Sequence, residues 1–157
     1  MVYYKNIGVS ALVAVALMVG HAPHVQAADA KNVRAASQAF YSALSVLDDG
    51  SAMENVWAKT PYVTFVGPRS RSIIVGWKAQ KNYWMKANKR FSRRHVLLTE
   101  QHLHVNGHFA WEVGIETADV KLTNGSVQKT TNIVTNVFEQ INGRWLMVSH
   151  QAQPMPH

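Results

Sequence analysis

The sequence predicts an α+β domain in which helices come first and a long curled antiparallel sheet follows. Before residue 94 the apolar residues recur at the three- and four-residue steps of helices. After it, stretches rich in Val, Ile, Thr, Phe and Trp are separated by Asn-Gly at 106–107, 124–125 and 142–143. Because both residues of Asn-Gly tolerate positive φ, this dipeptide is the strongest short signal for a β-hairpin.

The first part contains three helices and two short strands. Val33, Phe40 and Leu47 share one face of the first helix, which the turn residues Asp48-Asp49-Gly50 end. Pro61 then ends the helical pattern before the strand-like YVTFV. The expected helices cover 29–47, 51–57 and 77–91, and the expected strands cover 62–66 and 72–75.

The second part is predicted as an antiparallel four-stranded meander. Its strands are expected at 94–105, 108–122, 127–140 and 144–153. No linker, repeat or low-complexity segment divides the chain, so helices and sheet are expected to form one domain.

A targeting segment is expected before the domain. Lys5 supplies a positive start, residues 7–19 are an almost unbroken apolar run, and Val25-Gln26-Ala27 has the small-x-small pattern of a signal-peptidase site. The run is shorter than the roughly 20 apolar residues that span a bilayer. We therefore expect a signal peptide at 1–27, cleaved near Ala27, and a periplasmic or secreted domain at 28–157; an uncleaved leader that acts as an anchor is the alternative.

The composition of the chain excludes several kinds of chemical site and of binding partner. The chain has a formal net charge of +7 and no cysteine, which excludes disulfides, thiol nucleophiles and cysteine metal sites. The positive charge favours anionic partners, and nucleic acid is not expected for an exported protein. One cationic cluster is expected either to meet an anionic membrane surface or to be a solvated face: Lys86, Lys89, Arg90, Arg93 and Arg94.

Three segments carry a family resemblance: PYVTFVGPRSRSIIVGWKA (61–79), AWEVGIETADV (110–120) and TNVFEQINGRWLMVSHQAQP (135–154). They resemble the SnoaL-like branch of the NTF2-like superfamily, in the version found as the association domain of calcium/calmodulin-dependent kinases. FYSALSVLDDGSAMENVWA (40–58) fits the same pattern. The resemblance implies an NTF2-like cone, in which a curled sheet wraps the N-terminal helices around a pocket, and frequent dimers. It implies no single function, because the cone hosts isomerases, dehydratases, epoxide hydrolases and cyclases as well as members that only bind or assemble.

Two-residue turns would fix the register of the sheet and assign alternate residues of each strand to a face. We expect the face with the bulky aromatics to be concave, and the other, still apolar face to form a homodimer interface. A β-bulge would shift part of this register. The expected ligand-binding wall, from sheet and helices together, is Tyr41, Trp57, Tyr62, Trp111, Val113, Asn136, Phe138, Trp145, Ser149 and Gln151.

Glu100 is the one carboxylate that this register places in the pocket, since Glu112 and Glu116 fall on the opposite face. Glu100 and His102 lie two residues apart on one strand and could form a catalytic acid–base pair, or simply a half-exposed strand end. His102 and His104 have the spacing of some metal sites. No third ligand is evident, so neither a metal nor an organic cofactor is expected.

These observations leave three hypotheses. The first is an exported domain that binds a small, mostly apolar molecule in its cone. The second is a cofactor-free isomerase, dehydratase or cyclase, of the ketosteroid-isomerase type or a lyase, with Glu100 or His102 as its base. The third is a homo-oligomeric assembly module without catalytic activity.

Overall fold

The protein is described by a computed structural model that covers residues 22–156. Residues 1–21 of the expected leader lie outside the described residues, and the expected cleavage site near Ala27 falls within the first helix. No helix of residues 22–156 is both long enough and apolar enough to span a membrane. The elements are α1 (Ala22–Ser45), the 3-10 helix η1 (Ser51–Asn55), β1 (Thr64–Val66), β2 (Ile74–Val75), α2 (Trp77–Asn88), β3 (Phe91–Asn106), β4 (Phe109–Leu122), β5 (Val127–Ile141) and β6 (Arg144–Pro154).

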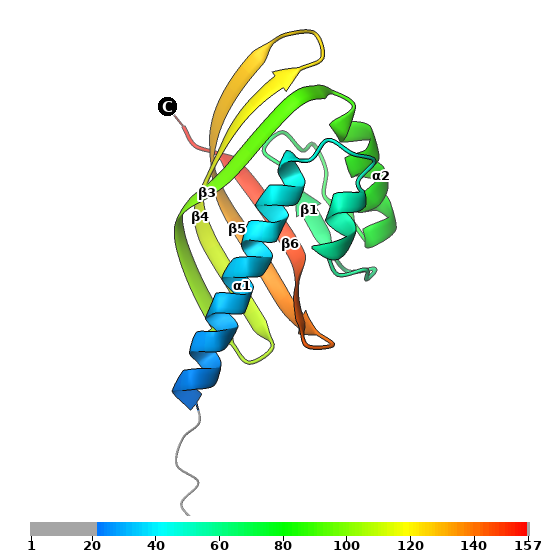
Figure 1. The fold of residues 1–157 in the computed structure, drawn as a ribbon. Helices are drawn as coiled ribbons and strands as arrows, with labels where there is room; N and C mark the ends of the chain where they lie inside the picture. The colour runs from blue at the N-terminus through cyan, green and yellow to red at the C-terminus, as the bar shows by residue number, and fades with distance from the viewer. Residues whose placement is uncertain (1–21, 157) are drawn as a thin grey trace, which may run out of the picture.

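All six strands belong to one sheet, in the order β2-β1-β6-β5-β4-β3. The predicted meander of the last four strands is confirmed, because β3 to β6 pair antiparallel with their neighbours in the chain. The two short strands extend this meander: β1 pairs in parallel with β6, and β2 pairs antiparallel with β1. The predicted α+β class is therefore correct (Figure 1).

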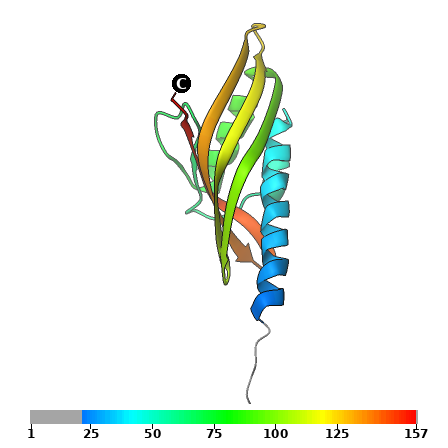
Figure 2. The ribbon, with the colours of Figure 1, turned by 90° about the vertical axis from the view of Figure 1, so that its left-hand side faces the viewer.

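The sheet curls, and the helices lie against its concave side (Figures 1 and 2). Helix α1 packs along β3 and reaches β6, whereas α2 lies at the end of the sheet formed by β1 and β2. The side chains between helices and sheet form one hydrophobic core, whose largest members include Phe40, Trp57, Phe65, Trp84 and Phe138. This layering is the cone that the resemblance implied.

Three register shifts interrupt the strand pairing: one lies between Phe91 and Arg93, and the other two are bulges that decide on which face several predicted site residues lie. One bulge lies in β3, where the pairing with β4 shifts between Thr99 and His102 and Glu100 has a φ of 51°. The other lies in β6, where Val137 pairs with Ser149 but Phe138 pairs with Met147, which leaves Val148 as an extra residue. Because side chains alternate in a strand, each bulge moves the following residues to the other face.

The bulges overturn part of the predicted inner face. Beyond the first bulge Leu103 and Val105 point inward, and beyond the second His150 does. The residues that were expected inside but are exposed or only half-buried are Glu100, His102, His104, Ser149 and Gln151.

The face predicted for β4 is also wrong. His104 pairs with Trp111 and Val105 with Ala110, so the two-residue turn is Gly107-His108 and not the predicted Asn106-Gly107. Trp111 is 43% exposed on the convex side, together with Phe109 and Val113. The concave side instead carries Ala110, Glu112, Gly114, Glu116 and Ala118. Small residues are needed there because the curled strands approach closely: a Cβ on Gly114 would lie 2.8 Å from Leu98 Cδ1.

Candidate ligand-binding cavity

A cavity of about 380 Å³ lies in the cone between α2, the loop 67–72 and the strands β3 to β5. Its walls are mainly apolar and aromatic, with side chains that include Phe65, Tyr83, Trp84, Phe91 and Val120. Glu116, Asn132, Arg94 and His150 are the buried polar side chains that line it. An apolar cavity with a few converging polar groups is the usual form of a small-molecule site.

Glu116 projects into this cavity from the concave side of β4 and is only 4% exposed. One carboxylate oxygen accepts a hydrogen bond of 2.9 Å from Asn132 Nδ2 on β5. Burial raises the pKa of Glu116 to about 7, against the smaller lowering effects of the Asn132 hydrogen bond and the Arg94 charge. Near neutral pH both protonation states are therefore populated, so this carboxyl can either take up or release a proton.

Arg94 is the buried cation of the cavity. Its Nη2 donates to Asn88 Oδ1 at 2.7 Å, and its Nε donates to the carbonyl oxygen of Leu44 at the end of α1. Burial lowers the pKa of Arg94 to about 10, which still leaves the guanidinium charged at neutral pH. Arg94 therefore joins both helices to β3 and adds positive charge beside Glu116.

His150 forms part of the cavity wall and stacks on Phe65, with ring centroids 5.2 Å apart. Burial lowers its pKa to about 3, so the imidazole is neutral at neutral pH. Asn136 donates its amide hydrogens to Tyr41 and Glu112, so its Oδ1 accepts from His150 Nδ1 at 2.7 Å. This tautomer leaves the lone pair of His150 on Nε2.

A second polar cluster lies further along the cone, between α1 and the sheet. Glu112 accepts hydrogen bonds from Ser37 Oγ and Asn136 Nδ2, both 2.7 Å long, and one from Gln101 Nε2. Glu112 and Asn136 are fully buried. Burial raises the pKa of Tyr41, and the charges of Glu116 and Glu112 add to this effect. The cluster is a hydrogen-bonded part of the core that does not line the cavity.

The structure places the residues of the predicted ligand wall in three different environments. One group is buried inside the cone but does not line the cavity: Tyr41, Trp57, Asn136, Phe138 and Trp145. A second group lies at the surface near β1 and β6: Tyr62, which donates to Glu139 Oε2 at 2.6 Å, Ser149, which pairs with Thr64, and Gln151. The third group, on the convex face of β4, is Trp111 and Val113. None of the ten residues lines the cavity, and a role in ligand contact stays a prediction for all of them.

The predicted acid–base pair is not in the cone. Glu100 and His102 lie at and just after the bulge of β3, and both are exposed. His104 is also exposed and packs against Trp111, with ring centroids 4.2 Å apart. Within residues 22–156 no three His, Asp or Glu side chains are close enough together to hold a metal ion.

Sequence reasoning missed Glu116, Arg94 and Asn132. One signal could have found Glu116: small residues alternate with the two glutamates of β4, as Ala110, Glu112, Gly114, Glu116 and Ala118. Small residues at alternate positions mark the concave side of a curled strand, where neighbours approach closely. Arg94 had no such signal, because the carbonyl oxygen that accepts from its Nε belongs to Leu44, fifty residues earlier in the chain.

The predicted cationic cluster is not one surface. Lys86, Lys89 and Arg90 are exposed, but Arg94 is turned into the cavity. Arg93 forms an ion pair of 2.7 Å with Asp119. The loss of two of its five cations weakens the case for a membrane-binding face.

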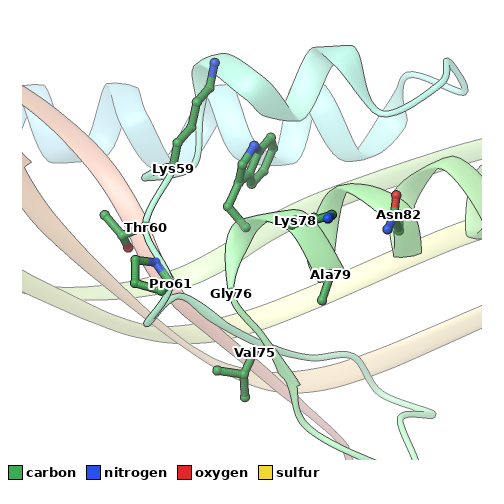
Figure 3. Close-up of a pocket in the computed structure, with 9 residues that line it drawn as sticks. Lys59, Thr60, Pro61, Val75, Gly76, Lys78, Ala79 and Asn82 are labelled. Atoms are coloured by element: carbon green, nitrogen blue, oxygen red, sulfur yellow. The ribbon is translucent and has the colours of Figure 1, made fainter.

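A second hollow, of about 630 Å³, lies on the outside of the domain (Figure 3). It is shallow and open, and its lining includes Lys59, Pro61, Val75, Gly76 and Lys78. Among the described residues that line it there is no carboxyl or imidazole group. The deeper cavity inside the cone is therefore the better candidate for a functional site.

Comparison with known proteins agrees with this architecture. The family described as the SnoaL-like domain matches residues 33–156. An NTF2-like superfamily protein from Salmonella enterica has 20% identity over 83% of this chain and 94% of that chain, with a TM-score of 0.76. A candidate dehydratase of the NTF2-like family from Streptomyces avermitilis has 21% identity over 83% and 99%, with a TM-score of 0.74.

The association domain of CaMKII from C. elegans also shares the fold, with 16% identity over 82% of this chain and 98% of that chain and a TM-score of 0.64. At such identities the likeness to these structures shows the fold alone. No curated protein matches the chain.

Proposed function

The chain belongs to the SnoaL-like domain family, and from this membership and its cavity we propose that it binds a small, mostly apolar molecule inside the cone. The cavity of about 380 Å³, with apolar and aromatic walls inside and polar groups that converge on it, carries the proposal. We further propose that binding takes place in the periplasm or outside the cell, since the N-terminal sequence has the form of a signal peptide cleaved near Ala27.

Native mass spectrometry of the protein purified from its own host tests both parts. We expect a mature chain that begins at Ala28 and carries a small molecule. The variant Ala118→Trp fills the cavity and should lose that molecule. Thr117→Trp is the matched control, because the neighbouring residue of β4 points to the other face and should leave binding intact. Equal occupancy in both variants would place the ligand elsewhere.

Glu116 favours a second candidate, a cofactor-free enzyme that moves a proton. A carboxyl with a pKa of about 7 in an apolar cavity is suited to general acid–base chemistry at neutral pH. It would remove a proton from carbon next to a carbonyl group and return it to another carbon, which is isomerisation, or promote loss of water. Glu116 takes the role that the sequence suggested for Glu100 or His102, which are exposed.

The isomerisation of cyclohex-3-enone to cyclohex-2-enone, followed by ultraviolet absorbance, tests this candidate with a small unactivated substrate. We expect a rate that rises with pH through about 7 as Glu116 loses its proton. Glu116→Gln should abolish the rate above background, whereas the exposed matched control Glu100→Gln should not change it. If Glu116→Gln and Glu100→Gln both kept the rate of the natural protein, Glu116 would not be the base, and ligand binding would remain the proposed function.

We also propose a homodimer through the convex face of the sheet. Exposed apolar side chains gather there from three adjacent strands: Leu97, Phe109, Trp111, Val113 and Ile133. The likeness to an association domain supports self-assembly in general. Light scattering after gel filtration should show a dimer that Val113→Lys dissociates. Ile73→Lys, on a loop outside the sheet, should not affect it. A stable dimer with an empty cavity would instead favour an assembly module.

A further inference from the structure

We infer that the ligand is an amphiphilic anion, whose carboxylate or similar head lies at the mouth of the cavity and whose apolar body lies inside. This inference rests on the proposed ligand-binding function and names the chemical class of the ligand. It comes from the distribution of charge around the cavity: four arginines, Arg69, Arg71, Arg90 and Arg94, line it against a single carboxylate, Glu116.

The arginines lie at two depths. Arg94 is buried, and its hydrogen bonds to Asn88 and to the carbonyl oxygen of Leu44 occupy it structurally. Arg69, Arg71 and Arg90 are exposed and form the rim, the first two on the loop after β1 and the third at the turn from α2 into β3. An anion at this rim would meet guanidinium groups from two separate segments of the chain, which is a geometry suited to carboxylate binding.

The rim arginines have no carboxylate partner of their own among the described residues. Each of the four ion pairs in residues 22–156 involves other cations. Arg69 donates to the neutral side chain of Gln128 at 2.9 Å, and this bond joins the loop to β5. The positive charge of Arg71 and Arg90 therefore remains available to a ligand.

The interior of the cavity suits the other end of such a ligand. Phe65, Tyr83, Trp84 and Phe91 provide aromatic surface, and His150 is neutral. Glu116 is buried and hydrogen-bonded to Asn132, whereas Arg71 and Arg90 are exposed and form no ion pair with it. A ligand with a flat apolar body would pack against these aromatic side chains inside the cavity, and its anionic head would lie near the arginines at the mouth.

Three ligands of nearly the same shape test this inference: 2-naphthoate, 2-naphthamide and 2-naphthylmethylammonium. Binding of each to the mature protein is measured by isothermal titration calorimetry at low salt and pH 7.5. We expect naphthoate to bind at least about tenfold more tightly than the amide, and the ammonium compound most weakly. Added salt should reduce the advantage of naphthoate, because an exposed ion pair is screened.

The double variant Arg71→Gln/Arg90→Gln removes the two unpaired rim charges. It should cost naphthoate most of its advantage and leave the affinity for the amide unchanged, which a general loss of folding would not do. Arg144→Gln is the matched control, since this exposed arginine lies at the turn between β5 and β6 and bonds only the Asn55 carbonyl oxygen. It should change none of the three affinities.

The outcomes separate the two proposals. Equal affinity for naphthoate and the amide, with no effect of the double variant, would overturn the anionic ligand and leave the cavity as a binding site. No binding of any of the three would count against both. Binding to phosphatidylglycerol vesicles without binding of naphthoate would also overturn the inference, in favour of a membrane surface.

Discussion

Glu112 and Glu116 lie four residues apart on the same face of β4, and both are almost completely buried, yet the cone treats them in opposite ways. Glu112 accepts hydrogen bonds from Ser37, Asn136 and Gln101. Glu116 accepts one side-chain hydrogen bond, from Asn132, and lines a cavity. The difference lies in what covers the strand.

Helix α1 closes the half of the cone that contains Glu112, because Ser37 and Tyr41 of that helix belong to the same hydrogen-bonded cluster. Above Glu116 no helix packs directly on the strand; the cavity lies there instead, bounded by α2 and the loop 67–72. A buried carboxyl with several donors is part of the structure, whereas one with a single donor beside open space keeps a perturbed pKa and is available for chemistry.

The largest predicted effect comes from breaking the closed half. Glu112→Ala leaves the donors of Ser37, Asn136 and Gln101 without their acceptor inside the core, and should lower the free energy of unfolding by about 4 kcal/mol. The matched variant Glu116→Ala removes one hydrogen bond beside an existing cavity and should cost about 1 kcal/mol or less. Urea unfolding of both variants at pH 4.5, where Glu116 is protonated in the folded protein and its ionisation adds no cost, measures the contrast, and equal losses would contradict it.

The second prediction concerns pH. Because the folded pKa of Glu116, about 7, lies above the reference value of 4.5, its contribution to stability is complete below pH 4.5 and is lost as the pH rises through 7. The loss amounts to about 3 kcal/mol. Glu116→Gln lacks this loss, so it should be more stable than the natural protein at pH 8, and the gap should close near pH 4.5.

His150 has the opposite dependence and must be included in that measurement. Its folded pKa of about 3 lies below the reference value of 6.5, so its contribution is complete above pH 6.5 and is lost as the pH falls toward 3. Between pH 4.5 and 6.5 the two groups oppose each other in the natural protein. In Glu116→Gln only the His150 trend remains, so its stability should fall steadily on acidification. Parallel curves for the two proteins in urea titrations from pH 4.5 to 8 would refute the pKa of Glu116.

Most of the fold could be predicted because it follows from the conformational preferences of short stretches of sequence. The last Asn-Gly hairpin follows from a local preference, because Asn142 and Gly143 form its two-residue turn and both have the positive φ that such a turn requires. The functional half of the cone was not predictable in this way. The inward direction of Glu116 depends on which face of β4 curls around the helices, and the outward direction of Glu100 and His102 depends on a bulge.

The bulge between Thr99 and His102 depends on a contact between β3 and β4, so it cannot be predicted from the sequence of either strand alone. It lies in β3 opposite Gly114 of β4, where Leu98 fills the space that a side chain at Gly114 would need. Bulky aromatics suggested the wrong face because their size favours burial in general, whereas the concave side of this strand has room only for small residues and for carboxyls that find donors. The prediction failed at a contact between two strands, not at a propensity.

The smallest predicted effect tests that contact. Gly114 lies midway between Glu112 and Glu116 on the concave face, at the border between the closed and open halves. In Gly114→Ala the new Cβ would lie 2.8 Å from Leu98 Cδ1 and 3.0 Å from the Thr99 carbonyl oxygen, so Leu98 must move and β3 must shift slightly. We expect a loss of about 1–2 kcal/mol in the free energy of unfolding. The double variant Gly114→Ala/Leu98→Val should recover part of it, because it removes the atom that the new methyl group meets; no recovery would show that the backbone carbonyl, not the Leu98 side chain, keeps this position free of a side chain.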